Sequence, residues 1–110
     1  MISFGVRMRR NQEIAKLKRN AGEAAEFLSV LANEKRLIIL CELLAAREMA
    51  VGELVEAVGI SQSALSQHLA KLRADGLVET RRESQTIYYR LSRDSRVLRS
   101  LTLLKELFCK

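Results

Sequence analysis

Two apolar patterns separated by a glycine constrain the fold of this chain more than any other feature. The segments "VGELVEAV" (51–58) and "SQSALSQHLAKLRA" (61–74) each repeat apolar residues at helical spacing. Gly59 follows the first segment where a helix often ends in the left-handed conformation, which costs glycine little. Ser61 is the expected N-cap of the second helix, which would end before Gly76. The sequence therefore predicts a helix-turn-helix unit.

The flanking segments predict one small, mainly α-helical domain with a β-hairpin (α+β). The segment 34–46 follows Asn33, a good N-cap, and is apolar around most of its circumference, so we expect this helix at the centre. Residues 1–10 are expected to form a basic tail that need not be ordered, and residues 11–110 a single domain. The predicted order is helices over 11–31, 34–46, 51–58 and 61–74, strands over 77–82 and 86–91 joined by the turn 83–85, and a last helix beyond residue 94.

The charge of the chain favours an acidic partner. Nineteen Lys and Arg against thirteen Asp and Glu give a formal net charge of +6, which suits nucleic acid above all. No apolar run approaches the roughly 18 residues that span a bilayer. The basic opening "MISFGVRMRRNQ" has no long apolar region after it and does not resemble a secretory signal. We therefore expect a cytoplasmic protein without a membrane partner.

The second helix of the predicted unit has an unusual polar face. Projected at about 100° per residue, its three leucines fall within roughly 60° of one another. A solvated helix face usually carries Glu and Lys, whereas Ser and Gln offer short donors and acceptors that suit base edges in a major groove. His68 projects beside the leucines, so we expect it to be packed and hydrogen-bonded inside the protein rather than in contact with a base. The predicted base readers on the opposite face are Gln62, Ser63, Ser66 and Gln67.

Basic and polar side chains around this face are candidates for phosphate contacts. Lys71 and Arg73 flank it, and the backbone N–H groups near Ser61 lie at a helix N-terminus, where anions bind. A basic ribbon beside a recognition helix is the layout of a winged helix-turn-helix. An edge hairpin that charge merely keeps soluble is the alternative. The hairpin contributes Arg81, Arg82, Gln85 and Thr86, with Arg90 on the return strand.

The strings "FLSVLANEKRLIIL" (27–40) and "MAVGELVEAVGISQSALSQHLAKLRADGLVETRRESQTIYY" (49–89) resemble the ArsR/SmtB family of bacterial winged-helix repressors. The resemblance is strongest to the NolR/BigR-like branch and covers residues 24–109. It implies a dimeric winged helix-turn-helix that binds double-stranded DNA at an inverted-repeat operator. It also implies that the first and last helices form the homodimer interface.

Metal sensing is common in this family, but its ligands are not recognisable in this chain. The usual sites are a paired-cysteine motif on the third helix or Asp/His clusters on the last helix. The segment 51–58 contains no cysteine, and His68 is the only histidine. Zinc requires three or four N, S or O ligands, so we expect neither a metal site nor another cofactor.

Cys41 and Cys109 are the remaining candidates for a sensor. Both contexts resemble the thiol pair of BigR-like, persulfide-responsive members, which implies a reversible disulfide or polysulfide bridge that weakens DNA binding. Two alternatives remain open. Cys41 lies on an apolar face and could be an inert, buried filler with a raised pKa, or the chain could be a NolR-like repressor without a thiol switch.

Two other classes of function fit the sequence poorly. A thiol-exchange enzyme would need a CxxC pair, or a cysteine near His and Asp, and the sequence offers neither, so we expect no enzymatic activity. A winged domain that binds only proteins would not need a Ser/Gln face or a basic hairpin. The sequence therefore predicts a sequence-specific DNA-binding transcriptional regulator, acting as a repressor.

Overall fold

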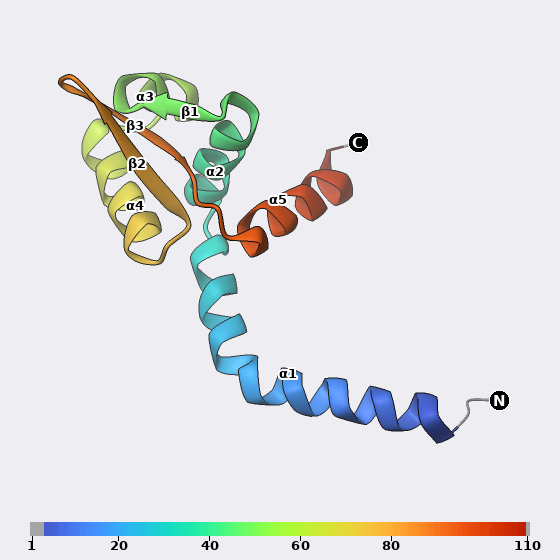
Figure 1. The fold of residues 1–110 in the computed structure, drawn as a ribbon. Helices are drawn as coiled ribbons and strands as arrows, with labels where there is room; N and C mark the ends of the chain where they lie inside the picture. Colours follow the sequence, from blue (N-terminus) through green and yellow to red (C-terminus); the bar gives the residue numbers. More distant parts are fainter. Residues whose placement is uncertain (1–3, 110) are drawn as a thin grey trace.

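The computed structural model describes residues 4–109, and the side chains from residue 9 onward. The described part is mostly helical and carries one small antiparallel sheet, which confirms the predicted winged helix-turn-helix class (Figure 1). Its elements are α1 (Phe4–Leu31), α2 (Glu34–Ala46), β1 (Glu48–Ala50), α3 (Val51–Val58), α4 (Gln62–Ala74), β2 (Val78–Glu83), β3 (Thr86–Leu91) and α5 (Ser95–Phe108).

Helix α2 lies at the centre of the domain, as its apolar circumference predicts. It begins after Asn33, whose side-chain oxygen accepts a hydrogen bond of 3.1 Å from the backbone N–H of Arg36. The side chains of Ile39, Leu40 and Leu43 are fully or almost fully buried. Helix α2 contacts every other helix and the strands β1 and β3, so a shift of α2 would be felt throughout the core.

The helix-turn-helix unit has the predicted boundaries. Helix α3 ends at Gly59, which adopts the left-handed conformation with φ of 75°. The Oγ atom of Ser61 accepts a hydrogen bond of 3.1 Å from the backbone N–H of Ala64, which confirms Ser61 as the N-cap of α4. The inner face of α4 is buried through three leucines, Leu65, Leu69 and Leu72. Local capping and leucine burial together fix the orientation of the outer face of α4.

The sheet contains one strand more than the sequence predicts. Residues 47–50 were expected to be a break between helices, but Glu48–Ala50 form β1, which pairs with β3. The predicted hairpin is confirmed as β2 and β3, with β2 shifted by one residue to Val78–Glu83. The strand order is β1-β3-β2, so β3 is the central strand. Three residues are too few to show an alternating pattern, and β1 becomes a strand through its pairing with β3.

The two faces of the sheet differ sharply in chemistry. Successive residues of a strand point to opposite faces. Met49 of β1 and Val78 of β2 are buried and mark the face toward the helices. The other face, which we call the outer face, carries charged and aromatic side chains from all three strands. They are Glu48, Glu79, Arg81, Glu83, Tyr88 and Arg90.

Helix α1 extends far from the rest of the molecule (Figure 1). It begins at Phe4, earlier than the predicted start near residue 11, so residues 4–10 are helical. Residues 1–3 of the predicted basic tail lie outside the described residues. Only the C-terminal end of α1 joins the core, where Val30 and Leu31 are buried. None of the described helices is both long and apolar enough to cross a membrane.

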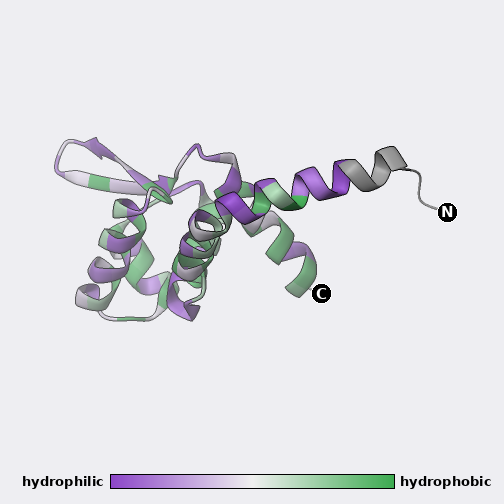
Figure 2. Cartoon of the chain, turned by 90° about the horizontal axis from the view of Figure 1, so that it is seen from below, coloured by the Kyte–Doolittle hydropathy of each residue, from purple (hydrophilic) through white to green (hydrophobic). Residues whose placement is uncertain are grey.

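Helices α1 and α5 leave large apolar side chains in solvent. Hydrophobic residues continue along α5 to its end (Figure 2). The helices are connected by an ion pair of 3.0 Å between Arg96 and Glu23. A hollow of about 770 Å³ lies between them and is lined partly by Phe27 and Leu103. The exposed apolar residues of the two helices are Ile14, Leu17, Leu28, Leu98, Leu103, Leu107 and Phe108.

Candidate nucleic-acid interface

The outer face of α4 presents the four predicted base readers to solvent. Gln62, Ser63, Ser66 and Gln67 are all exposed. Within residues 9–109, the structure records no hydrogen bond that engages their side chains. Their amide and hydroxyl groups therefore remain available to a ligand. This arrangement matches what a helix needs in order to read base edges, which offer donors and acceptors in the major groove.

Two neighbours of this face are occupied within the protein. The hydroxyl of Ser61 caps α4, so this residue can contact phosphate through the backbone N–H groups of the helix N-terminus rather than through its side chain. His68 is half-buried, in line with the packed position predicted for it. The described residues provide no hydrogen bond to its ring, so the predicted internal hydrogen bond is not found.

The cations near the end of α4 are accessible. Lys71 forms an i,i+4 ion pair of 3.0 Å with Asp75, but its side chain is 55% exposed. Such surface pairs contribute only about 0–1 kcal/mol, so a phosphate can replace the carboxylate at little cost. Arg73 is exposed, and among the described residues it has no ion-pair partner. Both cations lie in the last turn, where they also interact favourably with the helix dipole.

The hairpin turn carries a second group of exposed polar residues. Arg82 is exposed, and its Nε atom donates a hydrogen bond of 3.2 Å to the carbonyl of Ser84. Ser84 has φ of 58°, which closes the tight turn. Gln85 and Thr86 follow it and are exposed. Arg82 shares the face of β2 that is turned toward the helices, but lies beyond the core.

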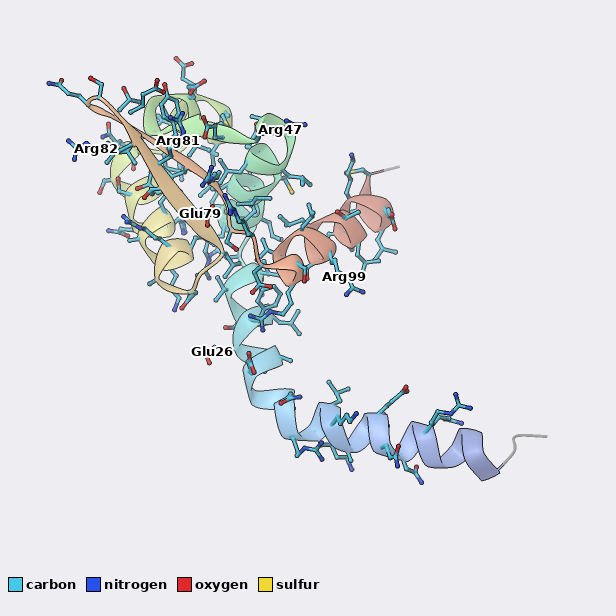
Figure 3. The ribbon with its side chains drawn as sticks, in the orientation of Figure 1. Glu26, Arg47, Glu79, Arg81, Arg82 and Arg99 are labelled. Atoms are coloured by element: carbon cyan, nitrogen blue, oxygen red, sulfur yellow. The ribbon has the colours of Figure 1, made fainter. Side chains whose placement is uncertain are left out.

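Arg81 does not lie with these residues. It belongs to the outer face of the sheet, and Figure 3 shows Arg81 and Arg82 on opposite sides of the hairpin. Its guanidinium forms a bidentate ion pair with Glu48, with distances of 2.6 and 3.2 Å, and a bond of 3.0 Å to Glu83. These hydrogen bonds raise the pKa of Arg81 and lower the pKa of Glu48. Arg90 is also paired, at 2.9 Å, with Glu79.

The sequence therefore misplaces Arg81 among the side chains that are free to contact phosphate. Its partner Glu48 could not be anticipated, because it lies in a strand that the sequence does not indicate and is distant along the chain. The other predicted contacts, from α4 and from the hairpin turn, are all exposed. The structure gathers them at α4 and at the tip of the hairpin (Figure 1).

The two cysteines line a common hollow on the far side of α2. Cys41 lies on α2, and Cys109 follows the last residue of α5. Both thiols are free and exposed, so Cys41 is not a filler of the core within this chain. Burial, the neighbouring Cys109 and Glu42 raise the pKa of the Cys41 thiol, in that order of effect. The hollow, which we call the thiol hollow, has a volume of about 540 Å³ and is lined by Leu37, Cys41, Leu44, Ala45, Leu104, Lys105, Phe108 and Cys109.

Metal-binding groups are not clustered in the described part of the chain. Among those residues, no group of three or more His, Cys, Asp or Glu side chains is arranged to hold a metal ion.

Comparison with known proteins shows the family. The model of the bacterial regulatory proteins of the arsR family matches residues 33–80. The nodulation protein NolR of Rhizobium meliloti is 59% identical over 85 residues, which are 77% of this chain and 68% of that protein. The transcriptional activator HlyU of Vibrio cholerae is 48% identical over 97 residues, 88% of each chain.

Solved structures agree with this assignment. The structure of reduced HlyU from Vibrio cholerae superposes with a TM-score of 0.79 at 49% identity, covering 86% of this chain and 98% of that one. The transcriptional repressor BigR from Xylella fastidiosa gives a TM-score of 0.79 at 38% identity, over 87% of this chain and 96% of that one. These relatives are regulators of transcription rather than enzymes. The chain belongs to the ArsR family of DNA-binding transcriptional regulators.

Proposed function

We propose that this regulator is a repressor that binds an inverted-repeat operator as a homodimer. The observation that carries the proposal is the outer face of α4, where four exposed amide and hydroxyl side chains lack partners among the described residues. Phosphate contacts would come from the N-terminus of α4 at Ser61 and from the exposed side chains around it. These are Lys71, Arg73, Arg82, Gln85 and Thr86.

The homodimer is proposed to form through α1 and α5. Both helices expose several large apolar side chains, and contiguous apolar surface of this kind usually marks an interaction site. Pairing of these faces between two copies would place two α4 helices in successive major grooves, about 34 Å apart. The DNA would then be read as a near-palindrome. Because DNA is the proposed ligand, we infer that the protein acts in the cytoplasm.

Selection from a library of random duplexes tests the proposal. The full-length protein is expected to enrich a sequence with twofold symmetry, whose half-sites have centres about 10 base pairs apart. Enrichment of an asymmetric sequence would show that the inverted repeat is wrong. Failure to enrich any sequence would remove the proposal of specific recognition. Repression itself is tested by transcription in vitro from a promoter that overlaps the selected sequence, where the protein is expected to lower transcript yield.

We further propose that a reversible bridge between Cys41 and Cys109 switches DNA binding. The support is that the thiols line one hollow and that α2, which carries Cys41, packs against both helices of the helix-turn-helix unit. A disulfide would form when the two thiols lose two protons and two electrons to an oxidant such as diamide, which is reduced to the hydrazine. A polysulfide would insert sulfur atoms between the same two residues. A NolR-like regulator without a switch is the alternative.

Operator affinity of reduced, diamide-treated and polysulfide-treated protein separates these two possibilities. Wild-type protein is expected to lose affinity after either treatment and to regain it with dithiothreitol. The variants Cys41→Ser and Cys109→Ser should keep the affinity of the reduced protein throughout. Equal affinity of all three wild-type samples would favour the regulator without a switch.

A further inference from the structure

One arginine connects all three strands of the sheet. Arg81 lies on β2, at one edge of the sheet, and Glu48 lies on β1, at the other edge. Tyr88 of the central strand β3 is the direct neighbour of Arg81 in the strand register. The Arg81 guanidinium lies 4.7 Å from the centre of the Tyr88 ring and reaches across β3 to the Glu48 carboxylate at 2.6 Å.

The bond geometry favours a fixed orientation of the hairpin. Two separate nitrogens of Arg81 donate to the two oxygens of Glu48, which restrains both the distance and the angle between their strands. Both side chains are only about one-third exposed, at 37% and 33%. Glu83 also accepts from Arg81, but it belongs to the same strand and is 67% exposed. Only the Glu48 contact can therefore restrain β2 relative to β1.

The surroundings of β1 explain why this restraint matters. β1 is three residues long and directly connects α2 to α3, so it is anchored in the core at both ends. The hairpin, by contrast, extends beyond the core, with Arg82, Gln85 and Thr86 exposed near its tip. A small rotation of β2 and β3 about their base would move these residues a long way relative to α4.

We propose that Arg81 is a positioning residue, which holds the hairpin through Glu48 in the orientation that lets Arg82 and the turn reach DNA. This inference rests on the proposed contact between the hairpin tip and DNA. It assigns different roles to two adjacent arginines. Arg82 contacts phosphate, and Arg81 sets where Arg82 lies.

Replacement of each arginine by lysine separates the two roles. Lysine retains the positive charge and binds phosphate as a point charge, but it cannot form the bidentate pair with Glu48. Arg81→Lys is therefore expected to lower operator affinity about fivefold to tenfold, a loss within the range of coupling energies for contacting residues. The matched variant Arg82→Lys should stay within about twofold of wild type. Wild-type affinity of Arg81→Lys would overturn the inference.

Charge exchange supplies a second, independent test. Arg81→Glu alone places like charges together and is expected to lower operator affinity at least tenfold. Adding Glu48→Arg restores an opposite-charge pair between β2 and β1, and should recover most of the loss. Glu48→Arg should not rescue Arg82→Glu, which removes a phosphate contact directly. If the Arg81→Glu variant is not rescued either, Arg81 is not a positioning residue.

A measurement without DNA distinguishes failure of this inference from failure of the proposed hairpin contact. Amide hydrogen exchange in the β1–β3 ladder of the free protein should be faster in Glu48→Gln than in wild type. The control Glu83→Gln removes a carboxylate from the same guanidinium and should leave this exchange unchanged. Equal exchange in wild type and Glu48→Gln would overturn the inference. If Glu48→Gln accelerates exchange but Arg82→Ala leaves operator affinity unchanged, the proposed hairpin contact is wrong.

Discussion

Cys41 and Cys109 line one apolar hollow, although the first lies in the middle of the chain and the second near its end. The contact between α2 and α5 brings them to the same place. Lys105 is the only charged side chain among the residues that line the hollow, and leucine, alanine and phenylalanine form most of its wall. A thiol in such surroundings ionises less readily than one in water.

The Cys41 thiol should react slowly with iodoacetamide at neutral pH. Its pKa is raised, first of all by burial, so the reactive thiolate is scarcer than in a free cysteine and increases only at higher pH. In the Cys109→Ser variant, which has a single thiol, the alkylation rate at pH 7 should be several times lower than that of a cysteine peptide. The rate should still be rising above pH 9, as followed by mass spectrometry. A rate equal to that of the peptide at every pH would contradict the assigned environment.

Gln62→Ala should relax the preference of the protein for its operator. A bidentate contact between a side chain and a base contributes about 1–3 kcal/mol of discrimination, so the ratio of operator to random-DNA affinity should fall about tenfold. Lys71→Ala is the matched control, because a lost phosphate contact weakens both affinities alike. Fluorescence anisotropy with both duplexes measures the ratio. An equal fall in both affinities for Gln62→Ala would show that Gln62 is not a base reader.

Leu28→Glu should dissociate the proposed dimer. Leu28 is 59% exposed on α1 and lines the hollow beside α5, where a second copy would cover it. A buried, unpaired carboxylate opposes association strongly. Sedimentation velocity should show a monomer for this variant and a dimer for wild type. Ala57→Glu, on the exposed face of α3, introduces the same charge away from these helices and should remain dimeric. A dimeric Leu28→Glu protein would place the interface elsewhere.

Acid should weaken the start of α5. The carboxylate of Asp94 accepts a hydrogen bond of 2.9 Å from the backbone N–H of Arg96 and forms an ion pair with its side chain. These contacts with Arg96 hold the pKa of Asp94 below its ordinary value of 3.8. Their stabilisation is therefore complete above that value and is lost as the pH falls through the lower pKa of the folded state.

Urea unfolding of wild type and Asp94→Asn at pH 6, 4 and 3 measures this effect. Asparagine still caps a helix but carries no charge. The difference between the free energies of unfolding of the two proteins should shrink as the pH falls. A difference that is constant over this range would show that the Asp94 charge does not stabilise the fold.

Local signals made the helix-turn-helix unit predictable. Gly59 and Ser61 act within a few residues of their own positions, so the boundaries of α3 and α4 follow from the sequence. The polar face of α4 is equally local, because helix geometry alone separates it from the leucines. For this reason the four proposed base readers could be identified before the fold was known.

Features that depend on distant partners could not be predicted. β1 is a strand only because β3 lies beside it. The pairing of Arg81 with Glu48 depends on that strand, so the sequence grouped two adjacent arginines that the sheet separates. The early start of α1 was missed for a different reason, because residues 4–10 have no apolar periodicity that marks a helix.

The long extension of α1 has a consequence for the life of the protein in a cell. Isolated helices are only marginally stable, and most of this 28-residue helix makes no contact with its own core. Association that covers it would make the stability of the protein depend on its concentration. A newly made or scarce copy would expose α1 to proteases, whereas an abundant one would be protected. The cellular half-life of such a regulator would then rise with its own expression level.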